Sequence, residues 1–582
     1  MVDIFSIITL LGGLALFLYG MTAMSNGLEK MAGSRLESIL KKLTSNRFRG
    51  LLLGTVVTAV IQSSSAVTVM LVGLVNSGVM KLSQTTSVVM GSSIGTTITA
   101  WILSLSGIEG SNVWLNLLKP ENFSPILAFI GILLIMVSKS QKKKDGGSIL
   151  IGFAILMFGM EMMSGAVKPI SETPQFTSLL TAFSNPILGV IIGALFTAAI
   201  QSSSASVGVL QALSLTGTIT YNTAIPIITG QNIGACVAAF IASFGTIKNA
   251  KRVALIHFLF KIIGTVLFLS IWTLAKTVFV VSFADDIVKP YNIAIIHTAF
   301  NVISTIILFP FANLIEKLSC RIIKDSDTKE KAALLDERLM TVPSVAVAKA
   351  FEVTIDMSTT AKSAVDKSMA LIRKYSDKEA AEVEKMEEKI DRFEDELGTY
   401  LIKLSALEVT EADGNQISKM LHTISDFERI GDHASNLVSV AQEIDSKGIT
   451  FSGEANKELA ILYSALNEIM SITYASFEKN DTERAKTVEP LEEVIDKLVI
   501  EIKNRHINRL RAGECTIEIG FVLTDLLTNI ERISDHCSNI AVAVIESAHG
   551  TFDAHEYLDT MKSQDLAEFS KNYSSYRKKY AI

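Results

Sequence analysis

Two identical runs of neutral hydrogen-bonding residues are the first candidates for chemistry in this sequence. Gln-Ser-Ser-Ser occurs at positions 62–65 and again at 201–204, inside the matching blocks Thr58–Ala66 and Thr197–Ala205, which lie 139 residues apart. Serine hydroxyls rotate to suit an acceptor, and a glutamine carboxamide offers both a donor and an acceptor. Two such clusters facing one another would surround a tetrahedral oxyanion with neutral donors. The predicted anion-binding residues are Gln62, Ser63, Ser64, Ser65, Gln201, Ser202, Ser203 and Ser204.

Each run interrupts an apolar stretch that is too long for one membrane crossing. A crossing takes roughly 20 helical residues, whereas the stretch 49–78 continues apolar on both sides of its break. Non-helical backbone at that depth is tolerated only where it is buried in protein or lines a cavity. We therefore predict a re-entrant hairpin of two half-helices at each run. The free N–H groups and the dipole at the start of the second half-helix would favour an anion.

A second polar cluster follows each break after about thirty residues. Gly91–Thr97 reads GSSIGTT, and its counterpart Gly230–Cys236 reads GQNIGAC. Sodium prefers oxygen ligands of this kind. The predicted sodium ligands are Ser92, Ser93, Thr96, Thr97, Gln231 and Asn232. Because Ala235 and Cys236 replace the two threonines, we expect the ion site to be less symmetric than the repeat.

Packing is the alternative explanation for small hydroxyl residues in membrane helices. Serine and threonine let transmembrane helices approach closely and share helix hydrogen bonds. The duplication of Gln-Ser-Ser-Ser at the centre of two overlong apolar segments favours a binding site over packing. The Gly91–Thr97 stretch taken alone fits either reading.

Carboxylate pairs repeat in the C-terminal part of the chain. ERIGDHASN at 428–436 recurs as ERISDHCSN at 531–539, and EEKID at 387–391 has a counterpart in EEVID at 492–496. A spacing of i,i+4 places two carboxylates on one helical face, where they suit hard or first-row cations. The predicted metal ligands are Glu428, Asp432, Glu531 and Asp535. Acidic pairs are also common on solvated helix faces, and an arginine stands beside each pair.

Charge divides the chain into a membrane part and a soluble part. Residues 1–320 hold 20 Lys and Arg against 11 Asp and Glu, whereas residues 321–582 hold 33 against 48. The acidic half argues against a nucleic-acid partner. Four scattered cysteines without CxxC spacing indicate neither a disulfide framework nor a zinc site. Because Met1-Val2-Asp3 lacks the basic start of a signal peptide, we expect the segment from Ile4 to remain as a membrane span.

The fold class that follows is all-α, with a polytopic membrane domain of two repeats and a helical bundle after it. The expected spans are about 4–24, 84–106, 123–138, 148–164, 222–244, 253–275 and 291–315. The expected domains are a membrane domain at 1–320, a charged linker at 321–342, a tandem helical bundle at 343–550 and a tail at 551–582. The membrane domain divides into repeats at about 5–138 and 148–275 and a final span at 291–315.

The distribution of basic residues predicts the orientation of these spans. If each hairpin returns to its side of entry, three crossings separate the two repeats, which are then inverted. The basic run Lys142–Lys144 then falls on the same side as the basic loop 25–49. A hairpin that crossed fully would move this run outside, against the positive-inside rule. We therefore expect a multi-pass protein of the cell membrane, with its N-terminus outside and residues 316–582 in the cytoplasm.

Four ionisable residues lie within the expected spans, of which Glu161 is near the outer end and is expected to be solvated. Lys261 is about two turns from the cytoplasmic end, and we expect it to snorkel to the interface. His257 and His297 could titrate near neutral pH, although a hydrogen-bonded role between helices is favoured over that function. Such residues are functional candidates by default.

Paired QSSS runs, each followed by a G-x-N-I-G-T-T-like segment, resemble the type II sodium–phosphate cotransporter family over roughly residues 5–315. The resemblance implies phosphate as substrate, sodium as the driving ion and an elevator-like movement of the hairpin-bearing part. Ser92-Ser93 and the missing threonines of the second repeat depart from the family pattern. The C-terminal bundle resembles PhoU, whose E-x-x-x-D helices can carry metal. The PhoU resemblance implies a regulatory domain that can hold a divalent metal. The cotransporter resemblance implies sodium as the co-substrate.

The leading hypothesis is therefore a sodium-coupled symporter that imports inorganic phosphate across the lipid bilayer. Two alternatives stay open, a membrane-anchored phosphate sensor and a symporter of another oxyanion. The chain is not expected to be an enzyme, because no GxSxG elbow surrounds the serines and no nearby His or Lys would activate a hydroxyl. Two anion cradles also suit binding better than channel permeation. A homodimer is compatible with this reading.

Overall fold

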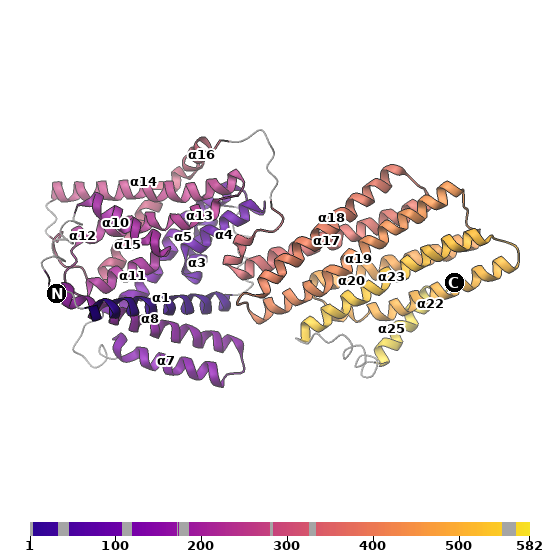
Figure 1. Ribbon diagram of the computed structural model, residues 1–582, viewed down its shortest axis with the longest axis horizontal. Helices are drawn as coiled ribbons and strands as arrows, with labels where there is room; N and C mark the ends of the chain where they lie inside the picture. The colour runs from indigo at the N-terminus through magenta and orange to yellow at the C-terminus, as the bar shows by residue number, and fades with distance from the viewer. Residues whose placement is uncertain are drawn as a thin grey trace. The chain divides into compact units, whose positions relative to one another are not determined.

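The computed structural model describes residues 4–32, 46–107, 119–171, 173, 185–279, 283–324, 333–549 and 566–582. It consists of two compact units, Met1–Val345 and Ala346–Ile582. All the elements of the described residues are helices, and a single isolated β-bridge joins Thr220 to Ile287. The all-α class is confirmed (Figure 1).

Six helical segments of the first unit are long and apolar enough to cross a membrane. They are Ile4–Met31, Leu82–Gly107, Gln141–Pro169, Tyr221–Ser243, Lys248–Val278 and Pro290–Ile322. The corresponding helices are α1 (Ile4–Ala32), α5 (Leu82–Leu103), α8 (Gln141–Ser171), α12 (Tyr221–Gly234) with α13 (Cys236–Ser243), α14 (Lys248–Phe279) and α15 (Pro290–Leu308). The remaining expected span falls on α7 (Pro120–Val137), which is apolar but shorter.

Both predicted hairpins are present. The first consists of α3 (Arg47–Ile61) and α4 (Ser64–Asn76), and the second of α10 (Pro186–Ile200) and α11 (Ser203–Ser214). None of these four helices exceeds 15 residues, or roughly 22 Å at 1.5 Å per residue. Each is therefore too short to cross the membrane alone.

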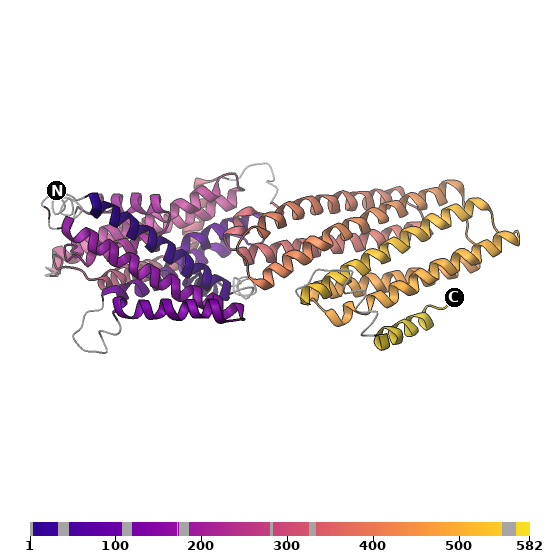
Figure 2. The same ribbon diagram turned by 60° about the horizontal axis from the view of Figure 1, so that its bottom comes forward.

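The two hairpins lie at opposite ends of α14, which confirms that the repeats are inverted. At the end of the first hairpin, the Asn76 side chain accepts a hydrogen bond from the backbone N–H of Ile247, just before α14 begins. Just after the second hairpin, the N–H of Asn222 at the start of α12 donates to the carbonyl of Ala284, after α14 has ended. The long helix α14 runs through the first unit between these ends (Figures 1 and 2).

In each repeat, a glycine brings the first hairpin helix into backbone contact with the span that follows the hairpin. A Cβ at Gly91 of α5 would lie 1.9 Å from the carbonyl oxygen of Leu51 in α3, and one at Gly230 of α12 would lie 2.1 Å from that of Val190 in α10. The first hairpin helix of each repeat thus packs on the span that follows its hairpin. Helices α1 and α8, the first spans of the two repeats, lie side by side, with α7 against α8 (Figure 1).

The last expected span lies within the apolar segment Pro290–Ile322 and is interrupted by a 3-10 turn. Helix α15 ends at Leu308, and the 3-10 turn η2 (Phe309–Phe311) contains Pro310, which has no N–H to continue the helix. Helix α16 (Ala312–Ile322) follows, with Leu314, Leu318 and Ile322 exposed along one side. Such an apolar stripe is typical of a helix that lies in the membrane interface.

Part of the expected linker belongs to the fold of the first unit. The 3-10 helix η3 (Glu337–Thr341) packs on α4, and Asp336 and Leu339 are buried. The side-chain amide of Asn76 donates to Asp336 at 2.5 Å, and Arg338 donates to the carbonyl of Phe244 at 2.7 Å and to that of Ala242. We call residues 333–342 the strap. It fastens the returning half of the first hairpin.

The second unit is built from long helices (Figure 1). These are α17 (Pro343–Arg373), α18 (Asp377–Ser405), α19 (Glu411–Lys447), α20 (Gly453–Lys479), α22 (Val488–Arg511) and α23 (Ile517–His549), with the short α21 (Thr482–Ala485). In the expected tail, α25 (Leu566–Lys579) packs against α22. Lys579 forms an ion pair with Glu468 at 2.8 Å, so this part of the tail is attached to the bundle.

Candidate substrate site

The two Gln-Ser-Ser-Ser runs have the same backbone geometry. Gln62 and Gln201 end the first half-helix of each hairpin in the left-handed region, with φ of 58° and 59°. The hydroxyls of Ser63 and Ser202 then cap the second half-helix by accepting hydrogen bonds from the N–H groups of Ala66 and Ala205. Each run is thus a C-cap followed at once by an N-cap. The backbone turns sharply there and exposes the start of a new helix.

Hydrogen bonds join the breaks across the repeats. The Ser204 hydroxyl donates to the backbone carbonyl of Gln62 at 3.4 Å, and the Ser65 hydroxyl donates to that of Ala235 at 3.5 Å. Ser64, Ser65, Ser203 and Ser204 are all buried. The first bond joins residues 142 positions apart and the second joins residues 170 positions apart, so the structure brings the two repeats together at the breaks.

Several polar groups at the breaks are not used by the protein itself. Ser64 and Ser203 open α4 and α11, and within the described residues their hydroxyls donate to no other residue. The buried Oε1 atom of Gln62 has no hydrogen-bond partner there either. Because buried polar atoms are normally paired, the unpaired Oε1 atom of Gln62 marks a place for a ligand beside the starts of the two half-helices.

The two breaks differ in their exposure. Gln62 is 7% exposed, whereas Gln201 lies at the surface. In the second hairpin the Thr197 hydroxyl donates to Ser206 at 2.7 Å, while the equivalent Thr58 hydroxyl has no partner among the described residues. The two glutamines therefore differ in environment, although the serines that follow them are buried alike.

The predicted sodium ligands of the first repeat are buried on an unbroken helix. The hydroxyls of Ser92, Ser93, Thr96 and Thr97 donate to carbonyls of their own helix, at 2.7–3.2 Å. Their oxygen lone pairs remain available, but α5 supplies no unwound carbonyls here. In the second repeat the helix is interrupted at Ala235, between α12 and α13. Gln231 is turned toward α11, where its amide donates to the carbonyl of Ser206 at 3.0 Å.

The expectation that Lys261 snorkels is wrong. Its ammonium is buried and donates to the Oδ1 atoms of Asn232 at 2.9 Å and Asn301 at 2.8 Å. These two amides satisfy the charge inside the protein, so the side chain does not need to reach the interface. The expected hydrogen bonds of His257 and His297 are also absent. Both rings are buried, and within the described residues none of their nitrogens has a partner.

In the second unit, two three-carboxylate groups meet between neighbouring helices. Glu387, Asp391 and Asp432 form one, and Glu492, Asp496 and Asp535 form the other, with their ligand atoms within 4.8 Å of one another. Each group thus contains one predicted residue from the E-x-x-x-D pairs. Of the other two, Glu428 lies beside Arg429, and Glu531 pairs with Lys503 at 3.6 Å. The repeated EE-x-I-D blocks in the sequence could have identified the missed partners.

The electrostatics of these groups suit a cation. Burial raises the pKa of Glu492 to about 8, with further contributions from Asp496 and Glu489. Burial also raises the pKa of Asp496 and Asp535 in the same group, and of Glu387 and Asp391 in the other. Carboxylates that repel one another in a partly buried place are the donor set that a hard divalent cation would take.

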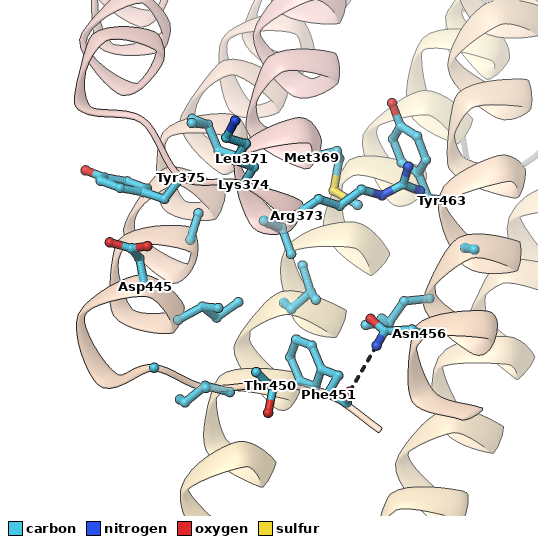
Figure 3. A pocket seen from close by; sticks show the side chains of 18 residues that line it. Met369, Leu371, Arg373, Lys374, Tyr375, Asp445, Thr450, Phe451, Asn456 and Tyr463 are labelled. Atoms are coloured by element: carbon cyan, nitrogen blue, oxygen red, sulfur yellow. Dashed lines mark hydrogen bonds between the residues drawn. The ribbon is translucent and has the colours of Figure 1, made fainter. Parts of the chain in front are cut away.

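A separate cavity of about 690 Å³ lies between α17, α19 and α20 (Figure 3). Arg373 points toward Tyr463 at one side, with the guanidinium 5.6 Å from the ring centre. Asn456 donates to the carbonyl of Phe451 at 3.0 Å at the other. The carboxylate groups do not line this cavity.

Comparison with known proteins matches both units. The Na+/Pi-cotransporter family model matches residues 16–165 and 155–284, and the PhoU domain model matches residues 354–441 and 461–544. YjbB of Salmonella typhimurium, which is named as a candidate inorganic phosphate export protein, is 24% identical over 567 residues, covering 95% of this chain and all of its own. The rat sodium-dependent phosphate transport protein 2A is 36% identical over 98 residues, 16% of this chain and 15% of its own. The PhoU structure from Pseudomonas aeruginosa aligns with 36% of this chain and all of its own, at 20% identity and a TM-score of 0.34.

Proposed function

This chain belongs to the Na+/Pi-cotransporter family and carries PhoU domains, which makes it a phosphate transporter, and we propose that it couples the movement of phosphate to sodium. The observation that carries the proposed site is the contact between Ser204 and Gln62, which joins the N-terminus of α11 to the break between α3 and α4 inside the membrane unit. Broken helices that face one another near the midplane are the usual substrate site of secondary transporters built from inverted repeats.

The anion would be held by neutral donors at the two breaks. The free N–H groups at the starts of α4 and α11, with the hydroxyls of Ser64 and Ser203, would surround phosphate on two sides. The Gln62 carboxamide would add a further group. Hydrogen bonds from neutral donors allow release as well as binding, because no fixed charge at the breaks pairs directly with the substrate. Sodium at the Ser92–Thr97 cluster would add compensating positive charge.

Import is the first candidate for direction, since an inward sodium gradient would draw phosphate into the cell. Export is a second candidate, because the relatives that match along their whole length bear the name of a candidate phosphate export protein. A symporter moves its substrate in whichever direction the summed gradients favour. Direction is therefore a property of the gradients as well as of the protein.

Reconstituted vesicles test both points. We expect labelled phosphate to accumulate in proteoliposomes under an inward sodium gradient, and to leave preloaded vesicles under an outward one. Potassium in place of sodium is the control. Transport at equal rates in sodium and potassium would contradict sodium coupling. Phosphate binding without any accumulation would instead favour the sensor hypothesis, and stronger competition by another oxyanion would favour a different substrate.

We further propose that the N-terminus faces outward and that the PhoU-like unit is cytoplasmic, where it regulates transport with a divalent cation bound at its carboxylate groups. The support for orientation is the basic run Lys142–Lys144 in the first turn of α8. A single cysteine at Ser140, in a background without native cysteines, should react only with reagents applied from the cytoplasmic side. One at Asp285 should react only from outside, and the reverse pattern would overturn the orientation.

A further inference from the structure

The second repeat contains a buried positive charge where the first repeat has only hydroxyls. Asn232, a predicted sodium ligand, stands 139 residues after Ser93, which is the spacing of the repeat. Its Oδ1 atom accepts a hydrogen bond from the ammonium of Lys261 at 2.9 Å. Lys261 and Asn232 are 4% and 3% exposed. An oxygen that was expected to face sodium is thus directed at a lysine of the chain.

The geometry around this ammonium is that of a cation site. The Oδ1 atom of Asn301 is the second acceptor, at 2.8 Å. The amide nitrogens of Asn232 and Asn301 donate to the carbonyls of Ile228 and His297, each at 2.9 Å, which fixes both oxygens toward Lys261. The rings of Phe260 and Phe300 have their centres 5.6 Å and 5.8 Å from the ammonium and add favourable aromatic faces.

Among the residues that the structure describes, this ammonium donates to the two amide oxygens and to no carboxylate. Its electrostatic neighbours are Cys236 of α13, His257 of α14 and His297 of α15. None of these three residues is a carboxylic acid. The two amide oxygens are therefore the groups that compensate this buried charge. The substrate site is close along the chain, since the Ser65 hydroxyl donates to Ala235, three residues after Asn232.

The first repeat has no equivalent charge. Within the described residues, no basic side chain donates to Ser92, Ser93, Thr96 or Thr97, whose hydroxyls bond only to their own helix. A sodium ion at this cluster would meet oxygen lone pairs and no competing cation. A sodium ion at Asn232 would have to displace the ammonium or share its oxygens, and two cations at that spacing repel one another.

We propose that Lys261 determines the sodium stoichiometry: its ammonium is a fixed cation that occupies the second repeat's cation position, so that only the first-repeat cluster takes up sodium. This inference rests on the sodium coupling proposed above. It predicts that one sodium ion moves with each phosphate. It also predicts that removing the lysine charge opens the Asn232 and Asn301 oxygens to a second sodium ion.

The test is the ratio of labelled sodium to labelled phosphate taken up by proteoliposomes. The native protein should show hyperbolic activation by sodium and one sodium per phosphate. Lys261→Gln should show sigmoidal activation and one more sodium per phosphate, while Lys261→Arg should behave as the native protein. Lys276→Gln is the matched control, because Lys276 lies on the same helix, donates to an asparagine oxygen at 2.9 Å and has the Trp272 ring centre at 5.9 Å. It should keep the native ratio.

A second readout does not depend on transport. Sodium should raise the thermal unfolding temperature of detergent-solubilised Lys261→Gln over a wider concentration range than that of the native protein, as expected when one more ion binds the folded state. An unchanged ratio and an unchanged sodium-dependent shift in Lys261→Gln would overturn the inference. A native protein that moves more than one sodium ion per phosphate would also overturn the inference. This measurement does not require the variant to fold.

The coupling and the inference can fail separately. If the native protein moves phosphate without sodium, the proposed coupling is wrong, and a sodium requirement gained by Lys261→Gln would still support the role of the lysine. If the native protein needs sodium and Lys261→Gln needs it with the same stoichiometry, the coupling stands and the inference is wrong. If neither protein responds to sodium, both are wrong.

Discussion

The hydroxyl of Ser204 donates to the carbonyl oxygen of Gln62 at 3.4 Å, across 142 residues of chain. This bond joins the N-terminus of one half-helix to the C-cap of the half-helix that precedes the other. A ligand at this junction would touch both repeats at once. Substitutions on either side should therefore affect the same property, the apparent affinity for phosphate.

Ser64→Ala and Ser203→Ala should each weaken phosphate binding, because each removes an uncommitted donor at the start of a half-helix. Loss of one hydrogen bond to a charged group costs about 1.5–3 kcal/mol, or roughly ten- to a hundredfold in apparent affinity. Phosphate dependence of uptake measures this effect. Ser148→Ala is the control, since that hydroxyl donates to its own helix at Lys144. Native apparent affinity in both site variants would show that these serines do not contact the substrate.

Much of this site could be predicted from the sequence. The duplicated QSSS runs identified the breaks because a polar, non-helical segment inside an apolar stretch has few stable solutions in lipid. The inversion followed from charge counting. The sequence could not predict that Lys261 would turn inward, because its partner Asn301 stands 40 residues away and Asn232 stands 29 residues before it. Side-chain direction over such separations depends on helix packing, which no local pattern specifies.

The strap and the carboxylate groups illustrate two further limits. The charged composition of residues 321–342 predicted a linker. In the structure, however, Leu339 and Asp336 of this segment are buried, and η3 packs on α4. The carboxylate partners of Asp432 and Asp535 were visible as repeated blocks, but the i,i+4 rule considers one helix at a time. Each group instead draws ligands from two helices. Tertiary contacts decided both cases.

Gly91→Ala should destabilise the membrane unit. The added Cβ would lie 1.9 Å from the carbonyl oxygen of Leu51, and backbone on both sides cannot yield without separating α3 from α5. Overpacking of this kind costs about 1–3 kcal/mol, and occasionally more. Thermal unfolding in detergent gives the comparison. Gly165→Ala is the control, because a Cβ there meets nothing within 4 Å, and it should be neutral or slightly stabilising. Equal unfolding temperatures for both variants would contradict the close packing.

Asp336→Ala should also lower stability, because it leaves the buried amide of Asn76 without its acceptor. An unsatisfied buried donor costs about 1–3 kcal/mol. The exposed Asp356→Ala is the control and should unfold as the native protein does. In the same way, a chain ending at Val345 should retain uptake, whereas one ending at Lys324 lacks the strap and should be less stable. Equal stability of the two shortened chains would show that the strap is dispensable.

Asp496→Asn should reduce the affinity of the second unit for manganese or magnesium. It removes one charge from the carboxylate group with Glu492 and Asp535. We expect a loss of at least about tenfold, since even residues that only support metal ligands typically cost that much. Calorimetric titration of the full chain measures it. Glu478→Gln, at an exposed position of α20, is the control. Identical titrations for the native protein and Asp496→Asn would show that this carboxylate group does not bind the metal.

The stability of the second unit should rise with pH in the alkaline range through Lys419. Burial lowers the pKa of this ammonium from 10.5 to about 7. Between these values the unfolded chain holds a proton that the folded chain lacks, so raising the pH favours the folded state. Denaturant unfolding between about pH 8 and 10 should show the rise in the native protein and a smaller one in Lys419→Met. Lys362→Met, which removes a surface ammonium bonded to Ser471, should keep the native slope. If the unfolding free energy of Lys419→Met rose with pH as steeply as that of the native protein, Lys419 would not be the titrating group.

The unequal exposure of Gln62 and Gln201 has a consequence for the transport cycle. The two repeats share one backbone plan and opposite orientations, so each can adopt the conformation that the other now has. Exchanging their conformations produces a second state of the same chain, in which Gln201 is enclosed and Gln62 reaches the surface. The path to the anion would then open on the opposite face of the membrane. In an inverted duplication, one conformation of the two repeats thus implies a second, in which the repeats have exchanged their roles.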